Sequence, residues 1–154
     1  MNHTRLANGT WALETSLDLP RPVEEVFPFF ADAFNLQRIT PPFLDFRVVT
    51  PGPIEMKRGA LIDYRLKLRG IPLRWRSEIA AWEPNRRFID TQVKGPYRLW
   101  HHEHLFEATP DGTRVIDKVH YAVPGGWLVQ KWLVGGDVER IFRYRQAQLI
   151  ELFG

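Results

Sequence analysis

Hydrophobic and polar residues alternate along most of this chain, and such alternation is typical of β-strands with one buried face. After residue 60, the joints between alternating segments are short and rich in Gly, Pro, Asn and Asp, so successive strands should pair as an antiparallel meander. The pattern predicts an antiparallel sheet of about six to seven strands. These strands are expected at residues 11–20, 46–50, 60–69, 72–82, 87–94, 99–108 and 114–123.

Three other segments have helical character. Arg21-Pro22-Val23-Glu24-Glu25 is typical of a helix start, because proline suits the first turn and acids favour the positive end of the helix dipole. Pro28 lacks the N–H that a helix interior needs, so this helix should be short or kinked. A second short helix is expected at 32–40. Residues 127–153 carry apolar side chains at a spacing of three or four, which predicts a long amphipathic helix.

Gly135 and Gly136 interrupt this C-terminal helix, and two interpretations fit them. A glycine inside a helix costs roughly 1 kcal/mol relative to alanine, so the pair favours a kink or a break, with Asp137 capping the second part. Alternatively, the backbone approaches a bound ligand closely at this point. Gly135 is therefore kept as a candidate ligand-binding position.

These elements predict an α+β fold in a single domain spanning residues 1–154, with the sheet curled around the C-terminal helix to cover its apolar stripe. The chain is 44% hydrophobic and 25% charged, which is ordinary for a globular domain of this length. It has no cysteine, which excludes disulfides and thiolate chemistry. No signal-like apolar run and no 18-residue apolar stretch are present, so we expect a soluble, cytoplasmic protein.

The segment from Leu99 to Phe106 carries the strongest functional signal. Read as a strand, it places on one face Trp100, His102, His104 and Phe106. This aromatic face should turn inward and take two imidazoles with it, and buried polar groups need partners. The histidines are then satisfied core residues, polar anchors for a ligand, or a working acid/base pair.

The same alternation supplies further candidates from other strands. Asp117 and Tyr121 should face inward, while in segment 87–94 the face is ambiguous and Asp90 is assigned inward against the preference of Ile89 and Val93. An aspartate beside a histidine orients the imidazole and raises its basicity, so the candidate catalytic residues are His102, His104 and Asp117. The candidate ligand-binding residues are Tyr64, Trp75, Ser77, Asp90, Trp100, His102, His104, Phe106, Asp117, Tyr121 and Gly135.

Aromatic residues make up 13% of the chain, with six Trp and ten Phe, and they can either fill a core or wall a pocket for an apolar ligand. His102 and His104 with an acid could also bind zinc, but the sequence shows no clear third ligand. We therefore expect no metal and no other cofactor.

A basic cluster lies on the polar face of one predicted hairpin, around the turn at Gly70. Any register of this hairpin places Lys or Arg opposite Arg, which is destabilising. The cluster is either an ordinary solvated face or a weak docking site for an acidic partner or anionic lipid. Nucleic acid is not expected, because the net charge is only +3 and no aromatic residue interrupts this face for stacking. The cluster comprises Arg65, Lys67, Arg69, Arg74 and Arg76.

Five motifs between residues 22 and 106 carry a resemblance to a known family. They are Pro22-Val23-Glu24-Glu25-Val26-Phe27, Asn35-Leu36, Ile39-Thr40-Pro41-Pro42, Trp82-Glu83-Pro84-Asn85-Arg86-Arg87-Phe88 and Trp100-His101-His102-Glu103-His104-Leu105-Phe106. With this element order, the chain resembles the SRPBCC superfamily (START-like, polyketide cyclase/dehydrase-like) over roughly residues 11–148. The resemblance implies a helix-grip fold, in which a sheet grips a C-terminal helix around a deep cavity, without naming a reaction.

Four motifs resemble a narrower bacterial subgroup, whose members occur alone or fused to an NAD(P)-dependent epimerase-like domain. They are Ile39-Thr40-Pro41-Pro42, Leu61-Ile62-Asp63-Tyr64, Gly95-Pro96-Tyr97-Arg98-Leu99-Trp100 and the His-x-His strand around His102 and His104. This chain has no G-x-G-x-x-G motif after a strand, and Pro28 and Gly135-Gly136 depart from the family pattern.

Three functional hypotheses follow. The first is a binding protein for a small apolar, aromatic or lipid-like molecule. The second is a cyclase- or dehydratase-type enzyme in which His102 or His104 moves protons with Asp117. The third is an accessory module of a separate epimerase-like enzyme.

Overall fold

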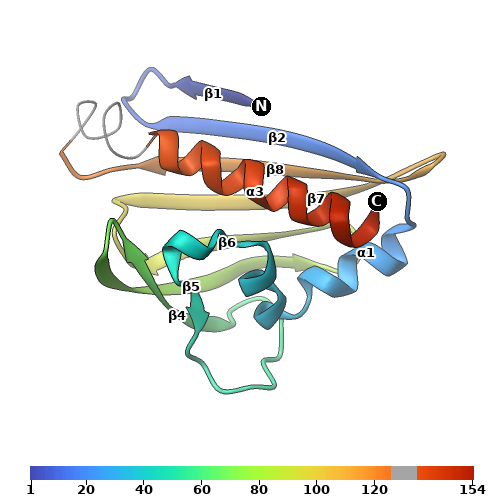
Figure 1. The fold of residues 1–154 in the computed structure, drawn as a ribbon, viewed down its shortest axis with the longest axis horizontal. Helices are drawn as coiled ribbons and strands as arrows, with labels where there is room; N and C mark the ends of the chain where they lie inside the picture. Colours follow the sequence, from blue (N-terminus) through green and yellow to red (C-terminus); the bar gives the residue numbers. More distant parts are fainter. Residues whose placement is uncertain (126–134) are drawn as a thin grey trace.

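The computed structural model describes residues 1–125 and 135–154, and its centre is one antiparallel sheet that curves around the C-terminal helix α3 (Gly135–Phe153; Figure 1). Eight strands are found in the described part of the chain, in the order β1-β2-β8-β7-β6-β5-β4-β3. Successive strands from β3 to β8 are neighbours, so the expected meander and the helix-grip architecture are confirmed. The strands are β1 (Asn2–Arg5), β2 (Trp11–Leu19), β3 (Arg47–Val48), β4 (Leu61–Leu68), β5 (Ile71–Glu83), β6 (Arg87–Lys94), β7 (Leu99–Thr109) and β8 (Gly112–Ala122).

Strand β1 extends the predicted sheet from seven strands to eight. Its residues are polar and mostly exposed, so no hydrophobic alternation marks it. The strand is held instead by pairing with β2 and by long-range contacts of His3. The His3 ring lies 2.5 Å from the Tyr121 hydroxyl and 3.2 Å from a Glu139 carboxylate oxygen on α3.

The helices between β2 and β3 are short, as the prolines predict. Helix α1 (Val23–Phe30) follows Pro22 and contains Pro28. Residues 32–40 form a 3-10 helix, η1 (Ala33–Ile39), rather than an α-helix, and a second 3-10 turn follows as η2 (Pro42–Leu44). No helix in the described ranges is long and apolar enough to span a membrane.

Helix α3 confirms the C-terminal amphipathic helix from Gly135 onward, whereas the helix predicted over residues 127–134 lies outside the described residues. Asp137 lies within the first turn of α3 instead of preceding it as a cap. Its carboxylate forms ion pairs with Arg140 at 3.7 Å and with Arg69 at 3.3 Å. A Cβ at Gly136 would meet no atom within 4 Å, so crowding does not require glycine there.

Two apolar clusters pack between the sheet and α3, and a third packs η1 against β4 and β5. The first joins α1 to the far ends of β7 and β8 and contains Leu19, Val26, Phe27, Phe30, Ile39, Phe88, Phe106, Val115 and Leu149. The second lies around the first turns of α3 and contains Leu13, Trp100, Val119, Tyr121, Val123, Val138 and Phe142. Along β7, β8 and α3, the residues between the two clusters are polar, so a polar layer crosses the core.

The β7–β8 turn gives a test of this packing. A Cβ at Gly112 would overlap the backbone oxygen of Leu19, the last residue of β2. We expect Gly112→Ala to lower the free energy of unfolding by roughly 1–3 kcal/mol, the usual cost of overpacking, as measured by urea denaturation. Gly136→Ala is the matched control, because open space surrounds it. The packing argument fails if both substitutions have the same effect.

Candidate functional site

A cavity of about 160 Å³ lies between the inner face of the sheet and α3. Its wall is built by side chains from η1, β4, β5, β6, β7 and α3, and most of that wall is apolar. Seven of the predicted ligand-binding residues line it, namely Tyr64, Trp75, Ser77, Asp90, Trp100, His102 and His104.

Three other candidates lie behind the cavity wall. Phe106 packs against Phe27 and Phe30 in the first cluster, and Tyr121 packs against Trp100 in the second. Asp117 is buried beneath the histidines and is not part of the wall itself. The prediction for Gly135 falls at the edge of the described residues and stays a prediction.

Strand β6 presents Phe88 and Asp90 to the interior, which resolves the ambiguous face of segment 87–94. Val93 is 51% exposed, so the apolar residues that favoured the opposite orientation point outward near the strand end. The inward turn of Asp90 brings its carboxylate against the histidines of β7, which pairs with β6 in register.

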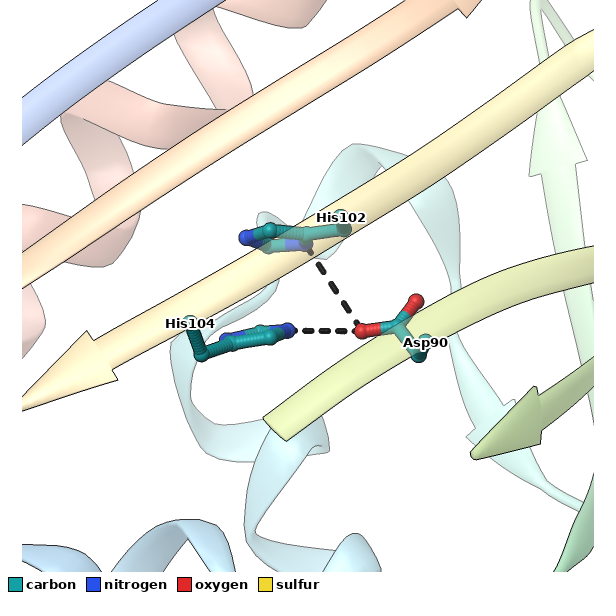
Figure 2. A group of neighbouring side chains, drawn as sticks. All are labelled: Asp90, His102 and His104. Atoms are coloured by element: carbon teal, nitrogen blue, oxygen red, sulfur yellow. Dashed lines mark hydrogen bonds and ion pairs between the residues drawn. The ribbon is translucent and has the colours of Figure 1, made fainter. Parts of the chain in front are cut away.

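Figure 2 shows the two histidines beside Asp90. His104 Nε2 lies 2.6 Å from Asp90 Oδ2, and the two imidazole rings stack with centroids 3.6 Å apart. On the opposite side, His102 Nε2 lies 2.8 Å from Asp117 Oδ1. Each imidazole therefore has its own carboxylate partner.

Arg145 completes the cluster, and the sequence analysis did not identify it. Its guanidinium NH2 lies 3.3 Å from Asp117 Oδ1 and 3.1 Å from His104 Nδ1, and the residue is only 4% exposed. A signal was present in the sequence. Val138, Phe142 and Leu149 form the buried stripe of α3, and position 145 continues that spacing. A long cation on an apolar stripe needs a buried acid as its partner.

Arg145 determines which ring nitrogen of neutral His104 carries the proton. An arginine side chain only donates hydrogen bonds, so His104 Nδ1 must accept from Arg145. Neutral His104 therefore carries its proton on Nε2 and donates it to Asp90. Burial, together with His102 nearby, lowers the pKa of His104 to about 4, with the bond to Asp90 opposing this shift. His104 is thus neutral at neutral pH, and both of its nitrogens are engaged.

Both carboxylates of the cluster are ionised. Burial alone would raise the pKa of Asp117, but the nearby Arg145 charge and the hydrogen bond from His102 outweigh it and hold this pKa well below its usual range. The pKa of Asp90 is also lowered, since the hydrogen bond from His104 and the surrounding charges exceed the effect of burial.

One edge of the cluster stays open. His102 Nδ1 lies 3.8 Å from Asp90 Oδ2, which is too far for a hydrogen bond. When His102 is neutral, its proton lies on Nε2 facing the Asp117 carboxylate, so Nδ1 and Asp90 present two acceptors to each other at the cavity wall. In addition, Arg145 Nε is buried without a hydrogen-bond partner among the described residues.

The pKa of His104 predicts a specific dependence of stability on pH. The unfolded chain binds a proton at His104 near pH 6.5 and the folded chain only near pH 4, so unfolding is favoured progressively as pH falls between these values. We expect His104→Gln to flatten the decline of unfolding free energy over this window, as measured by urea denaturation followed by tryptophan fluorescence. His101→Gln, on the outer face of β7, should leave it unchanged. An identical decline in wild type and His104→Gln would contradict the assignment.

Asp90, His102 and His104 also form the one group of potential metal ligands found in the described residues, with ligand atoms within 4.8 Å of one another. The structure thus supplies the third ligand that the sequence did not show. However, the proton on His104 Nε2 occupies the position of a metal, and the Arg145 guanidinium adds a positive charge alongside. These features disfavour a cation at this place.

We therefore predict well under one equivalent of any transition metal in tag-free protein, measured by inductively coupled plasma mass spectrometry. Zinc at one equivalent that survives dialysis against a chelator would refute this, provided that Asp90→Asn loses it and the outer-face control Asp63→Asn keeps it.

Solved structures with the same fold are numerous, and their sequences are mostly remote from this one. Protein CV1439 from Chromobacterium violaceum superimposes with a TM-score of 0.72 at 12% identity, covering 92% of this chain and 96% of that one. The major latex-like protein 151 from Panax ginseng gives a TM-score of 0.69 at 12% identity, covering 94% and 98%. These two similarities establish the fold alone.

A third structure, the nucleoside-diphosphate sugar epimerase from Corynebacterium glutamicum, is 27% identical with a TM-score of 0.68. The similarity covers 90% of this chain but only 28% of that one. No curated protein matches the sequence. The family model described as polyketide cyclase / dehydrase and lipid transport matches residues 19–150, nearly the whole fold. The chain therefore belongs to the polyketide cyclase/dehydrase and lipid transport family of helix-grip proteins.

Proposed function

We propose that this protein binds a small, mainly apolar molecule in the cavity between the sheet and α3 and orients it through one polar group. The observation that carries the proposal is the composition of the cavity wall. Aromatic and aliphatic side chains make up most of it, and the buried cluster around Asp90, His102 and His104 meets it on one side, with Asp32 and Asp137 also at its border. A few polar groups in an apolar pocket are the usual means of fixing a ligand's orientation.

The size of the cavity limits the ligand. An engineered protein cavity of about 150 Å³ is known to hold benzene, so about 160 Å³ fits one six-membered ring or a branched chain of similar volume. A larger member of the same chemical class would need the wall to move or would extend beyond the cavity through its open side. The ligand is thus expected to present one ring to the cavity.

Two tryptophans belong to the aromatic part of the wall. The rings of Trp75 and Trp100 meet edge to face with centroids 5.4 Å apart, and Tyr97 packs against both. Trp75 Nε1 donates to Ser77 Oγ, so its polar atom is satisfied within the wall. Burying an apolar group against such a wall contributes roughly 1.5–3 kcal/mol, more than a typical neutral hydrogen bond.

The open edge of the cluster determines which polar group the ligand should carry. His102 Nδ1 and Asp90 Oδ2, 3.8 Å apart, are both acceptors when His102 is neutral. A ligand hydroxyl or amine that donates into this edge relieves the repulsion between them. A hydrogen bond to the charged carboxylate contributes about 1.5–3 kcal/mol. A ring bearing a hydroxyl group satisfies both parts of the site.

An enzyme of cyclase or dehydratase type is the second candidate, because the family description names both reactions. The geometry of the cluster changes which residues would transfer protons in such an enzyme, compared with the set expected from the sequence. His104 is poorly suited as a base, because Arg145 and Asp90 engage both of its nitrogens. Proton transfer would fall to His102 Nδ1 and Asp90 at the cavity wall, with Asp117 positioning His102 from behind.

A role as an accessory module is supported by the 27% identity to one part of a longer epimerase chain. In that role, the same cavity would bind a small molecule while a partner performs the chemistry. The cavity is common to all three candidates, so ligand binding is the property to measure first.

The test uses toluene and 4-methylphenol, which differ by one hydroxyl group. We expect both to bind, detected by ligand-observed NMR, with 4-methylphenol about tenfold tighter because it donates to Asp90. Trp100→Ala should weaken both probes and weaken toluene more than His104→Ala does. Asp90→Asn should remove most of the preference for 4-methylphenol. Trp11→Ala, outside the cavity wall, is the control for a generally loosened fold.

If neither probe binds at millimolar concentration, the proposal is wrong. If a carbonyl substrate is turned over, and His102→Gln abolishes turnover while probe binding survives, the enzyme replaces the binding protein as the better description.

A further inference from the structure

A second feature lies on the outer face of the sheet, away from the cavity. Arg47 on β3, Arg65 on β4 and Arg74 on β5 are direct neighbours in register, so three arginines form one row across three strands. All three are exposed. Directly opposed like charges destabilise a sheet, so the fold gains nothing from this row.

On β8, two cations of this face lie beside acids. Lys118 is in register with Glu14 on one side and Glu103 on the other. Arg114 is likewise in register with Asp18 and Glu107. The row of three arginines has no acid in register, so it differs from these two positions of β8.

Two residues of the predicted basic cluster have acid partners, so they are not counted among its unpaired cations. Arg69 lies in the turn after β4 and forms an ion pair with Asp137 of α3 at 3.3 Å. Arg76 is in register with both Asp63 and Lys94, and its guanidinium binds Asp63 at 2.8 Å. The cluster is therefore smaller than the sequence predicted, and β3 adds Arg47 to it.

The row of arginines borders a hollow of about 370 Å³, together with Lys67 and Asp45. Asp45 forms ion pairs with Arg47 at 3.3 Å and with Lys67 at 3.9 Å. Arg65 and Arg74 form no ion pair within the described residues. Four cations thus face one carboxylate around a concave space.

We propose that this hollow binds a small soluble molecule through a phosphate or diphosphate group held by Arg65 and Arg74. The planar guanidinium fork matches phosphate oxygens in a bidentate geometry, and two forks on adjacent strands can hold one group from two sides. A multiply charged anion also removes the repulsion within the row. The volume leaves room for more than the phosphate itself, as in ordinary ligand pockets. The concave shape favours a small molecule over a flat membrane surface.

The experiment is calorimetric titration of the full chain with inorganic pyrophosphate at roughly 50 mM salt, where screening is still weak. We expect binding in the submillimolar range, weakened about tenfold or more in Arg65→Gln and in Arg74→Gln. Arg76→Gln is the matched control, since Arg76 lies two residues along the same face and is already paired with Asp63. It should change the affinity less than about twofold.

Thermal unfolding gives an independent readout. Pyrophosphate should raise the Tm of the wild type and of Arg76→Gln by mass action, and it should have little effect on Arg65→Gln or Arg74→Gln. Arg74→Lys keeps the charge and loses the fork, so its affinity should be intermediate.

Three results overturn the proposal. The first is no heat and no Tm shift with pyrophosphate at millimolar concentration. The second is an equal loss of affinity in Arg76→Gln and Arg74→Gln, which would indicate general charge attraction only. The third is binding to phosphatidylcholine vesicles containing phosphatidylserine that depends on Arg65 and Arg74 without any binding of pyrophosphate, which would assign the hollow to lipid headgroups.

Discussion

The buried ion pair between Arg145 and Asp117 is the interaction on which the core of this protein depends. It joins α3 to β8 in the polar layer between the two apolar clusters. Removing either partner would leave an unpaired buried charge, which typically costs 3–5 kcal/mol. The pair also determines the state of both histidines. Arg145 forces the proton of His104 onto Nε2, and ionised Asp117 accepts from His102. The cavity therefore receives its polar groups already oriented, which lowers the cost of ordering them around a ligand.

The position of this polar layer explains how one core can be both rigid and hollow. Aromatic rings pack edge to face on one side of it around Phe27, and tryptophans pack on the other side around Trp100. The charged layer cannot slide along the helix, because each of its groups would lose a specific partner. Buried polar groups often add less to stability than apolar packing would. Here they fix the register of α3 against the sheet and leave space where Asp90 meets the cavity.

The sequence predicted most of the sheet because alternation is a local property, and it failed where structure depends on distant partners. The inward turn of Trp100, His102 and His104 followed from period two alone. Strand β1 was missed because its few residues are polar and are ordered by contacts with Tyr121 and Glu139. Arg145 was missed because the burial of a charged residue on an apolar stripe can be inferred only when its acid partner, Asp117, is known to lie opposite. The orientation of β6 was ambiguous for the same reason, dependence on a distant partner. Asp90 turns inward to bind a histidine on the neighbouring strand.

Both proposed sites lie where the chain breaks a local rule of folding. Charges belong outside a core, yet Asp117 and Arg145 are buried together. Opposite charges belong across neighbouring strands, yet Arg65 lies between two arginines. Natural sequences depart from such rules mainly at functional sites and compensate elsewhere. The two departures differ in one respect. The buried charges already have partners within the fold. A ligand in the cavity therefore adds a further interaction and is not needed to neutralise them. In the arginine row only Arg47 has an ion-pair partner among the described residues, so a counter-charge for Arg65 and Arg74 would come from a bound anion.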